Sequence, residues 1–313
     1  MRIERATRRG LLLAMLATAP CVPAQAEPDR YETGHYTYEG HGSVNTHWIE
    51  TDDSVIVIDT QRDTVHAAEA LEAVRALGKP VSAILITHGH PDHYTGIEQF
   101  LEEWPDAEVY GSRETARVIE TDHYGYHDVV RELAPEAAPD NFIAPTVVFE
   151  DDATLTIDGV TLVTREMGAA EATGATIYYL PQTRELYAGD LVLNEMHGFY
   201  LEERSAEVLR ALERLKVLFP NAETVHPGHG TPGPASQLVA GTIDYTQYAR
   251  EVVARSIASG NTGPDAHSAV VAELNAAYPT YGVPGGQPDM IALSVQGLFD
   301  ELAAEPVVEA PQL

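Results

Sequence analysis

The sequence predicts an α/β fold, and two patterns support this prediction. Short apolar runs such as Val55–Ile58 and Val81–Ile86 have the length and the β-branched composition of buried strands. Between them, residues 64–77 place apolar side chains on one face and end at Gly78 and Pro80, as expected of an amphipathic helix. A strand, a helix and a second strand in this order indicate a βαβ unit within a partly parallel sheet.

The strongly acidic composition restricts the class of partner. The chain has 313 residues, enough for a full hydrophobic core in one or two domains, and its formal net charge is −29. Residues 1–26 hold four arginines and one glutamate, so the rest of the chain is even more acidic than the total. Such a surface argues against nucleic acid and anionic membranes as partners and leaves a small-molecule substrate as the expectation.

Residues 1–26 have the features of an export signal. Thr7–Leu12 resembles a twin-arginine motif, the apolar run at 11–19 follows it, and Ala24–Ala26 offers small residues for cleavage. The apolar run is too short to span a bilayer. We therefore expect a periplasmic protein without a membrane span, whose mature part lacks the only cysteine, Cys21, and hence any thiolate ligand.

Residues 27–313 are expected to form one domain. Turn residues and apolar periodicity predict strands at 36–38, 44–49, 55–58, 81–86, 107–110, 176–180, 185–188 and 223–225, a hairpin at 153–163 that turns at Asp158-Gly159, helices at 64–77, 113–119 and 205–219, and a helical C-terminal part at about 236–305. Residues 121–149 contain three prolines and are expected to be irregular, as a lid or pocket wall often is.

Four side chains that can bind a metal ion fall within six positions directly after a predicted strand: His88, His90, Asp92 and His93. The glycine and the proline between them predict a shaped loop without regular secondary structure. Imidazole and carboxylate ligands suit Zn²⁺, with iron or manganese as alternatives. We expect the first two histidines to bind one ion and the aspartate and third histidine a second. A polar surface loop with chance histidines is the weaker interpretation.

This H-x-H-x-D-H pattern resembles the signature of the metallo-β-lactamase superfamily, which implies an αββα sandwich, here with a helical C-terminal extension. Two further motifs match that family, Ala188-Gly189-Asp190 and Pro227-Gly228-His229-Gly230, so the resemblance covers residues 31–232. It implies that Asp190 bridges two ions and that His229 completes the second site. His226 competes for this role, but the family pattern makes it a packed or supporting residue.

The remaining ligand departs from the family pattern. Most relatives carry a Gly-His-Thr or Gly-His-Ser shortly before a Leu-Pro turn, where this chain has Glu171. We expect Glu171 to bind the first metal, since carboxylates are accepted zinc ligands. The alternatives are an empty position, Glu166 or His197. A third carboxylate makes the cluster less positive than usual, which predicts weaker zinc retention and favours Mn²⁺ or Fe²⁺ at this site.

The resemblance implies a hydrolase with two zinc ions per chain, in which a metal-bound hydroxide attacks a carbonyl and Asp92 is the catalytic proton acceptor. A lactam, lactone or ester is the expected substrate. Three alternatives stay open. One is a sulfate-ester hydrolase, because Glu171-Ala172 resembles the alkylsulfatases, which are much longer chains. The others are an iron-dependent oxygenase or oxidoreductase and a metal-binding protein without activity.

Several residues near these motifs have open roles. Asp59 closes a strand and is either a buried support for the metal loop, as in the family, or an ordinary helix-entry residue. His123 and His127 either reach the metals or lie in a solvated loop. The candidate residues for a substrate pocket, each with packing as the alternative, are His41, His47, Trp48, Tyr124, Tyr126, His197, Phe199 and Tyr200.

Overall fold

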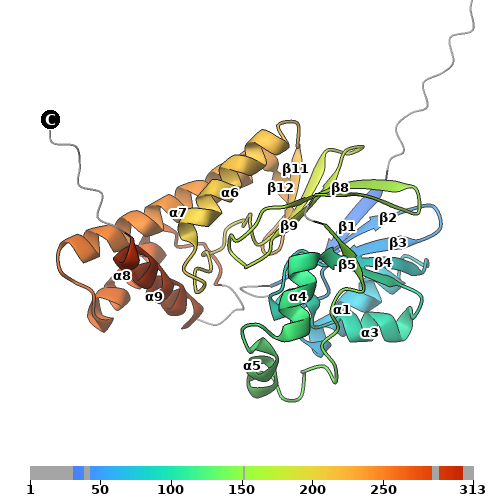
Figure 1. Cartoon of the computed structure of the whole chain (residues 1–313), viewed down its shortest axis with the longest axis horizontal. Helices are drawn as coiled ribbons and strands as arrows, with labels where there is room; N and C mark the ends of the chain where they lie inside the picture. Colours follow the sequence, from blue (N-terminus) through green and yellow to red (C-terminus); the bar gives the residue numbers. More distant parts are fainter. Residues whose placement is uncertain (1–30, 39–42, 151, 284–288, 306–313) are drawn as a thin grey trace, which may run out of the picture.

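Two six-stranded sheets form the centre of the structure (Figure 1). The computed structural model describes residues 31–38, 43–150, 152–283 and 289–305. The predicted export signal, with Cys21, and the pocket candidate His41 lie outside the described residues.

The first sheet joins antiparallel and parallel pairs in the order β1-β2-β3-β4-β5-β6. Its strands are β1 Glu32–Tyr36, β2 Thr46–Glu50, β3 Val55–Ile58, β4 Val81–Leu85, β5 Glu108–Ser112 and β6 Val147–Phe149. The first three strands pair antiparallel, and β3 to β6 run parallel. The predicted βαβ unit is therefore present, with β3 and β4 as its parallel neighbours.

The second sheet has the order β12-β11-β10-β9-β8-β7. Its strands are β7 Thr154–Ile157, β8 Val160–Glu166, β9 Thr176–Leu180, β10 Glu185–Gly189, β11 Thr224–Pro227 and β12 Gly233–Pro234. Strands β7 and β8 form the predicted hairpin, and both turn residues, Asp158 and Gly159, have positive φ. This backbone is typical of the type I′ turns that match the twist of a hairpin. Only β10 and β11 pair in parallel within this sheet.

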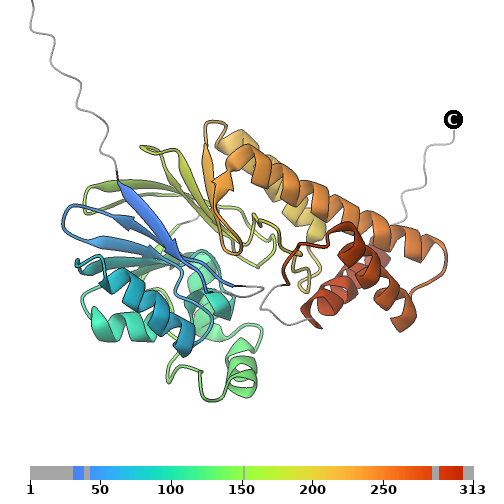
Figure 2. The ribbon, with the colours of Figure 1, turned by 180° about the vertical axis from the view of Figure 1, so that it is seen from behind.

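Helices cover the outer faces of both sheets. Their bounds are α1 Thr64–Arg75, α2 Pro91–Tyr94, α3 Ile97–Glu103, α4 Arg113–Thr121, α5 Tyr126–Leu133, α6 Ser205–Leu218, α7 Ala235–Ala258, α8 Pro264–Ala277 and α9 Asp289–Ala304. Helices α1, α3 and α4 lie beside the first sheet, whereas α6 and α7 lie beside the second, and α8 and α9 pack on the far part of α7 (Figures 1 and 2). Among the described residues, we find no helix long and apolar enough to cross a bilayer.

The core explains why these layers stack. On β3, Val55 and Val57 pack against the helices of the first sheet, whereas Ile56 and Ile58 belong to the cluster between the two sheets. This alternation is the period of two that a strand imposes on its side chains. A third cluster joins the second sheet to α6, α7, α8 and α9. The predicted αββα sandwich with a helical C-terminal extension is thus confirmed.

Two predictions about irregular segments are wrong. The metal loop contains a one-turn helix, α2, because Pro91 occupies its first position, where a proline costs no hydrogen bond. The segment 121–149 contains the helix α5 and the edge strand β6. Helix α5 has no buried residue, although Tyr126, Val129, Val130 and Leu133 follow the helical period over its eight residues. Helix α3 was not predicted at all.

The C-terminal helices attach to the sandwich through a buried carboxylate. Glu301 of α9 accepts hydrogen bonds from the backbone nitrogens of Ser205 and Ala206, at 2.8 and 3.0 Å. It therefore caps the N-terminus of α6, whose free N–H groups favour a negative charge. Arg250 of α7 completes the network with an ion pair of 2.8 Å to Glu301.

We expect Glu301→Ala to lower the free energy of unfolding by about 3 kcal/mol, because it removes a charged cap and leaves Arg250 without its buried partner. Urea-induced unfolding measures this change. Glu305→Gln is the matched control, since Glu305 also pairs with Arg250 but is exposed, and it should change the stability by less than about 0.5 kcal/mol. Equal losses in both variants would contradict the capping role.

Candidate metal centre

The structure brings all seven predicted metal ligands to one edge of the sandwich. They lie in the segments that follow β4, β10 and β11, with Asp92 and His93 in α2, and in the connection before β9. Two groups of side chains have ligand atoms within 4.8 Å of one another: His88, His90, Glu171 and Asp190 in the first, and Asp92, His93 and His229 in the second. Because the carboxyl ends of β4, β10 and β11 meet at this edge, residues more than 100 positions apart become neighbours.

Glu171, which stands where most relatives have a histidine, lies at the centre of the first group. Glu171 Oε1 lies 3.3 Å from Nδ1 of His90, and its Oε2 lies 3.8 Å from Nε2 of His88. Two ligands at about 2.0–2.2 Å from a tetrahedral zinc ion are separated by about 3.3–3.6 Å, so this spacing suits a shared cation. Glu171 is buried, which makes the interpretation of a solvent-facing side chain wrong.

Asp190 connects the first group to the second. Its Oδ2 lies 3.9 Å from Nε2 of His88 and 3.2 Å from Nε2 of His229, and its Oδ1 lies 3.4 Å from Nε2 of His93. Asp92 faces the same two histidines of the second group, at 3.3 Å from His229 and 3.8 Å from His93. One carboxylate therefore reaches both groups, as the predicted bridging role requires.

Each of the four histidines is oriented by a hydrogen bond at the nitrogen that faces away from the centre. The partners are Thr87 Oγ1 for His88 at 3.0 Å, Glu202 for His90 at 3.2 Å, Asp59 for His93 at 2.9 Å and the Ser43 carbonyl for His229 at 3.0 Å. Metal-binding histidines are held in this way, because the outer hydrogen bond fixes the tautomer that leaves the inner nitrogen free.

The ligand atoms that face the centre of the site show whether a cation fits there. Four buried atoms that face the centre have no hydrogen-bond partner: Nε2 of His88 and of His93, Oε1 of Glu171 and Oδ1 of Asp190. A buried polar atom without a partner is costly, and a cation would satisfy all four. The donor set of imidazole and carboxylate fits Zn²⁺, Mn²⁺ or Fe²⁺.

Asp59 supports the metal loop. Its two oxygens accept hydrogen bonds from the backbone nitrogen and the hydroxyl of Thr87, at 2.9 and 2.8 Å, and it also holds His93. The side chain is buried at the end of β3. Of the two roles left open for Asp59, the structure favours the support of the loop over helix entry, and Asp63 provides the cap of α1 instead.

Gly228 is required by the closeness of these loops. A Cβ atom at this position would lie 1.9 Å from Oδ1 of Asp190 and 2.9 Å from the His93 ring. Any side chain here would push the bridging carboxylate away, which explains the glycine between Pro227 and His229.

The alternative ligands lie outside both groups. Glu166 accepts hydrogen bonds from the backbone nitrogens of Gly168 and Ala175 and so shapes the Glu171 loop. His226 stacks on Tyr187 and bonds to Glu185, consistent with a packed residue. The two histidines of the segment 121–149 and His197 also lie elsewhere: His123 packs on Tyr124, His127 on Phe142 and His197 on Tyr245.

The aromatic pocket candidates divide into two sets. Tyr126 and Phe199 have rings 5.6 and 5.7 Å from the His90 ring, and Tyr124 packs on Tyr126. These three half-buried side chains form an aromatic wall beside the first group. The other candidates serve in packing: His47 bonds to the Pro227 carbonyl, Trp48 lies over Gly34, His197 bonds to Tyr245 and Tyr200 bonds to Thr246.

Sequence reasoning missed Glu202. Its side chain is only 5% exposed and lies 3.2 Å from Nε2 of His90. Residues 202 and 203 are both glutamates after the predicted pocket residues, and only the tertiary structure separates the buried one from the exposed one.

The charges at the centre are strongly coupled. Burial lowers the pKa of His229, but Asp190 and Asp92 raise it to about 10, and burial raises the pKa of Glu171 to about 7 against the opposing effect of His90. The pKa of His93 is likewise raised, because Asp190 and Asp92 outweigh its burial. The buried carboxylates therefore favour protonation of His93 and His229.

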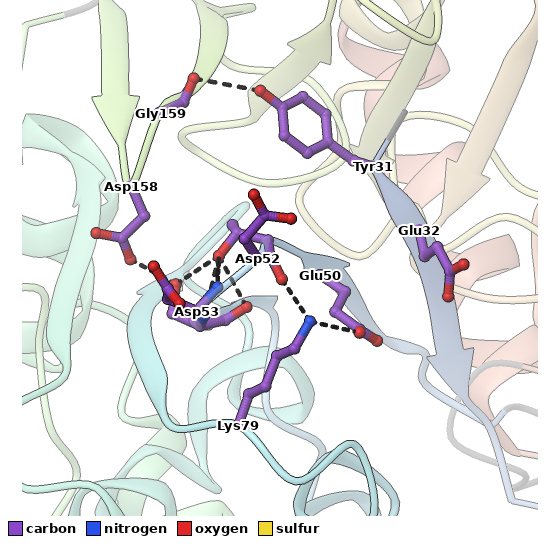
Figure 3. Close-up of a pocket in the computed structure, with 10 residues that line it drawn as sticks. Tyr31, Glu32, Glu50, Asp52, Asp53, Lys79, Asp158 and Gly159 are labelled. Atoms are coloured by element: carbon purple, nitrogen blue, oxygen red, sulfur yellow. Dashed lines mark hydrogen bonds and ion pairs between the residues drawn. The ribbon is translucent and has the colours of Figure 1, made fainter. Parts of the chain in front are cut away.

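A pocket of about 700 Å³ lies at the opposite end of the sandwich (Figure 3). It lies beside the turn between β2 and β3 and the turn of the β7–β8 hairpin, and none of the seven residues lines it. Lys79 is held there by Glu50 at 2.7 Å and by the Thr51 carbonyl. The site described above is therefore separate from this acidic pocket.

Fold and site together define the class of the protein, an αββα sandwich with a cluster of side chains able to hold metal ions at one edge. Residues 40–229 match the family model of the metallo-beta-lactamase superfamily, and the chain therefore belongs to that superfamily. The predicted family is thus confirmed.

Curated relatives within the superfamily have several activities. An alkyl/aryl-sulfatase of Saccharomyces cerevisiae is 27% identical over 195 residues, covering 53% of this chain and 30% of the sulfatase. A linear primary-alkylsulfatase of Pseudomonas is 24% identical, covering 64% of this chain and 44% of that protein. A hydroxyacylglutathione hydrolase of Actinobacillus pleuropneumoniae is 26% identical, covering 58% of this chain and 63% of the hydrolase. This chain thus spans less than half the length of the two sulfatases.

Solved structures agree on the fold. A metallo-beta-lactamase from Pontibacter korlensis has a TM-score of 0.53 and 25% identity, covering 69% of this chain and 94% of that one. The DIM-1 metallo-beta-lactamase has a TM-score of 0.55 and 18% identity, covering 70% and 97%.

We expect metal binding to release protons and to strengthen as the pH rises from about 6 to about 9. The raised pKa values of His93 and His229 mean that these rings are protonated at neutral pH in the metal-free protein, and a ligand nitrogen must lose its proton. Calorimetry in buffers of different ionisation enthalpy measures the released protons. A binding enthalpy independent of the buffer would contradict the prediction.

We expect Glu171→His to retain more zinc than the wild type after mild chelation, because a neutral imidazole leaves the cluster more positive overall and is a softer ligand. Glu171→Ala should lose the first ion altogether. Metal analysis after dialysis against a weak chelator measures both. The prediction fails if Glu171→His holds no more zinc than the wild type.

Proposed function

We propose that this chain is a two-metal hydrolase, with zinc as its metal, that opens an ester, lactone or lactam bond. One observation carries the proposal: seven side chains from four segments of the chain gather in two adjoining groups, and four of their buried nitrogen and oxygen atoms have no hydrogen-bond partner. The family assignment supports the class of reaction. When bound, two divalent cations supply Lewis-acid chemistry, which polarises the bond to be cut and acidifies water.

The carboxylates of the site would have different roles in the reaction. Asp190 and Glu171 are buried and hold the rings of both groups in place. Asp92 is the most exposed carboxylate of the seven residues, with 28% of its side chain accessible. Burial alone would raise the pKa of Asp92, but His93 and His229 lower it strongly. Asp92 is therefore ionised at neutral pH, the charge state in which a carboxylate can accept a proton.

The charge of the site gives little electrostatic attraction to an anionic substrate. Three carboxylates among the seven ligands offset much of the charge of two divalent ions, so the centre attracts anions weakly. The aromatic wall of Tyr124, Tyr126 and Phe199 suits an apolar group next to the scissile bond.

A sulfate ester is the second candidate. Two observations favour it: the position of Glu171 beside His88 and His90, which resembles the carboxylate ligation of alkylsulfatases, and the sequence similarity to two sulfatases. An iron-dependent oxygenase uses the same fold, and bound iron with oxygen consumption would select it. Export by the segment 1–26 to the periplasm is our proposal from the sequence alone.

We expect the mature protein to contain zinc and to hydrolyse at least one member of a panel of a chromogenic cephalosporin, a lactone and an aryl ester. Asp92→Asn should lower kcat about 10²- to 10⁴-fold, because it removes the proton acceptor. Asp106→Asn, at an exposed position outside both groups of ligands, is the matched control and should leave kcat unchanged.

The same panel separates the alternatives. An aryl sulfate as the only substrate would select sulfate-ester hydrolysis. Retained metal without turnover of any compound would favour a metal-binding protein without hydrolase activity and overturn the proposal.

A further inference from the structure

We propose that Glu202 is a positioning residue that orients His90 and the Glu171 loop for the first metal ion. The inference rests on the proposed metal centre, but it does not depend on which bond the enzyme cuts. None of the family motifs in the sequence includes Glu202, which lies in the connection between β10 and α6.

The two nitrogens of His90 face two different carboxylates. Nδ1 lies 3.3 Å from Glu171 Oε1, on the side of the metal ligands, and Nε2 lies 3.2 Å from Glu202 Oε1. A neutral imidazole has one N–H and one lone pair. Because a carboxylate accepts the N–H at Nε2, the lone pair stays on Nδ1, where a metal ligand is needed.

The second oxygen of Glu202 holds the loop that carries Glu171. Oε2 accepts hydrogen bonds from the Thr173 hydroxyl at 3.1 Å and from the Tyr124 hydroxyl at 3.0 Å. Thr173 follows Glu171 by two positions, and Tyr124 belongs to the aromatic wall. One buried carboxylate thus connects both ligands that define the unusual first site.

The charge of Glu202 is balanced on its outer side. Arg204 lies 3.3 Å from Glu202 Oε2 and donates to Thr173 Oγ1 at 3.0 Å. With this arginine, the network carries no net charge beyond that of the metal ligands. The same design recurs in the second group, where the buried carboxylate of Asp59 holds His93.

The helical C-terminal part fixes the segment that presents Glu202. Tyr200 bonds through its hydroxyl to Thr246 of α7 at 2.8 Å, and its carbonyl lies where a Cβ of Gly297 in α9 would be, 2.1 Å away. Three residues after Glu202, the Ser205 nitrogen donates to Glu301 of α9. The extension seen beside the second sheet in Figure 1 therefore positions Glu202 as well as completing a core.

Metal affinity tests the proposal independently of activity. Titration of the metal-free protein with zinc against a chromophoric chelator measures the zinc affinity of each of the two sites. We expect Glu202→Ala to weaken one site about 10- to 100-fold and to leave the other unchanged. Glu202→Gln should lose less zinc affinity, because its side-chain oxygen can still accept a hydrogen bond from His90. Glu203→Gln, at the exposed neighbouring position, is the matched control and should bind as the wild type does.

A double-variant experiment identifies the affected site. In a Glu171→Ala background, which lacks the first site, Glu202→Ala should cause no further loss of zinc affinity. The proposal is overturned if Glu202→Ala binds both ions normally, if both sites weaken equally, or if Glu202→Gln loses as much as Glu202→Ala. Should Glu202→Ala not fold, Thr173→Val takes its place: a weaker first site supports the proposal, and unchanged binding overturns it.

If the wild type hydrolyses no compound of the substrate panel, the proposed function is refuted, but the zinc titration still tests the role of Glu202. Unchanged zinc affinities with normal turnover would refute only the role of Glu202.

Discussion

The structure depends on the concentration of charge at one edge of two sheets. Asp59, Glu171, Asp190 and four imidazoles are almost entirely buried there, within a few ångströms of one another. Buried carboxylates are costly unless cations or hydrogen bonds compensate them. In the metal-free protein, protons on the histidines supply part of this compensation, and divalent ions would supply it more completely. The requirement for cations therefore links folding, metal binding and the proposed chemistry.

The αββα architecture makes this concentration of charged side chains possible. Parallel pairing of β3 with β4 and of β10 with β11 brings the carboxyl ends of four strands to the same edge, where short loops carry the ligands. The core between the sheets keeps these loops in register. Each histidine is then oriented from behind by a hydroxyl, a carbonyl or a carboxylate, so the geometry does not rely on the metal alone.

The departure at position 171 has consequences beyond one ligand. Replacing an imidazole with a carboxylate lowers the charge of the first site and places Glu171 in competition for a proton, with a pKa of about 7. A second carboxylate, Glu202, faces His90 from the other side, and the helical extension holds it there. The first site thus holds a carboxylate where the family pattern has an imidazole, which suits a harder cation or a weaker hold on zinc.

The sequence by itself determined the candidate ligands in the three family motifs and the unusual position of Glu171, because short motifs are local features of the chain, and the resemblance that these motifs carry implied the αββα class. It also pointed to Asp59 without deciding its role. Only the tertiary structure separated Glu202 from the exposed Glu203, and it showed that His197 and His226 pack in the core rather than face the metals. It also revealed α5, whose helical period spans only eight residues. The physical reason is that contacts across more than 100 residues are set by how sheets and helices stack, and no local spacing records that stacking.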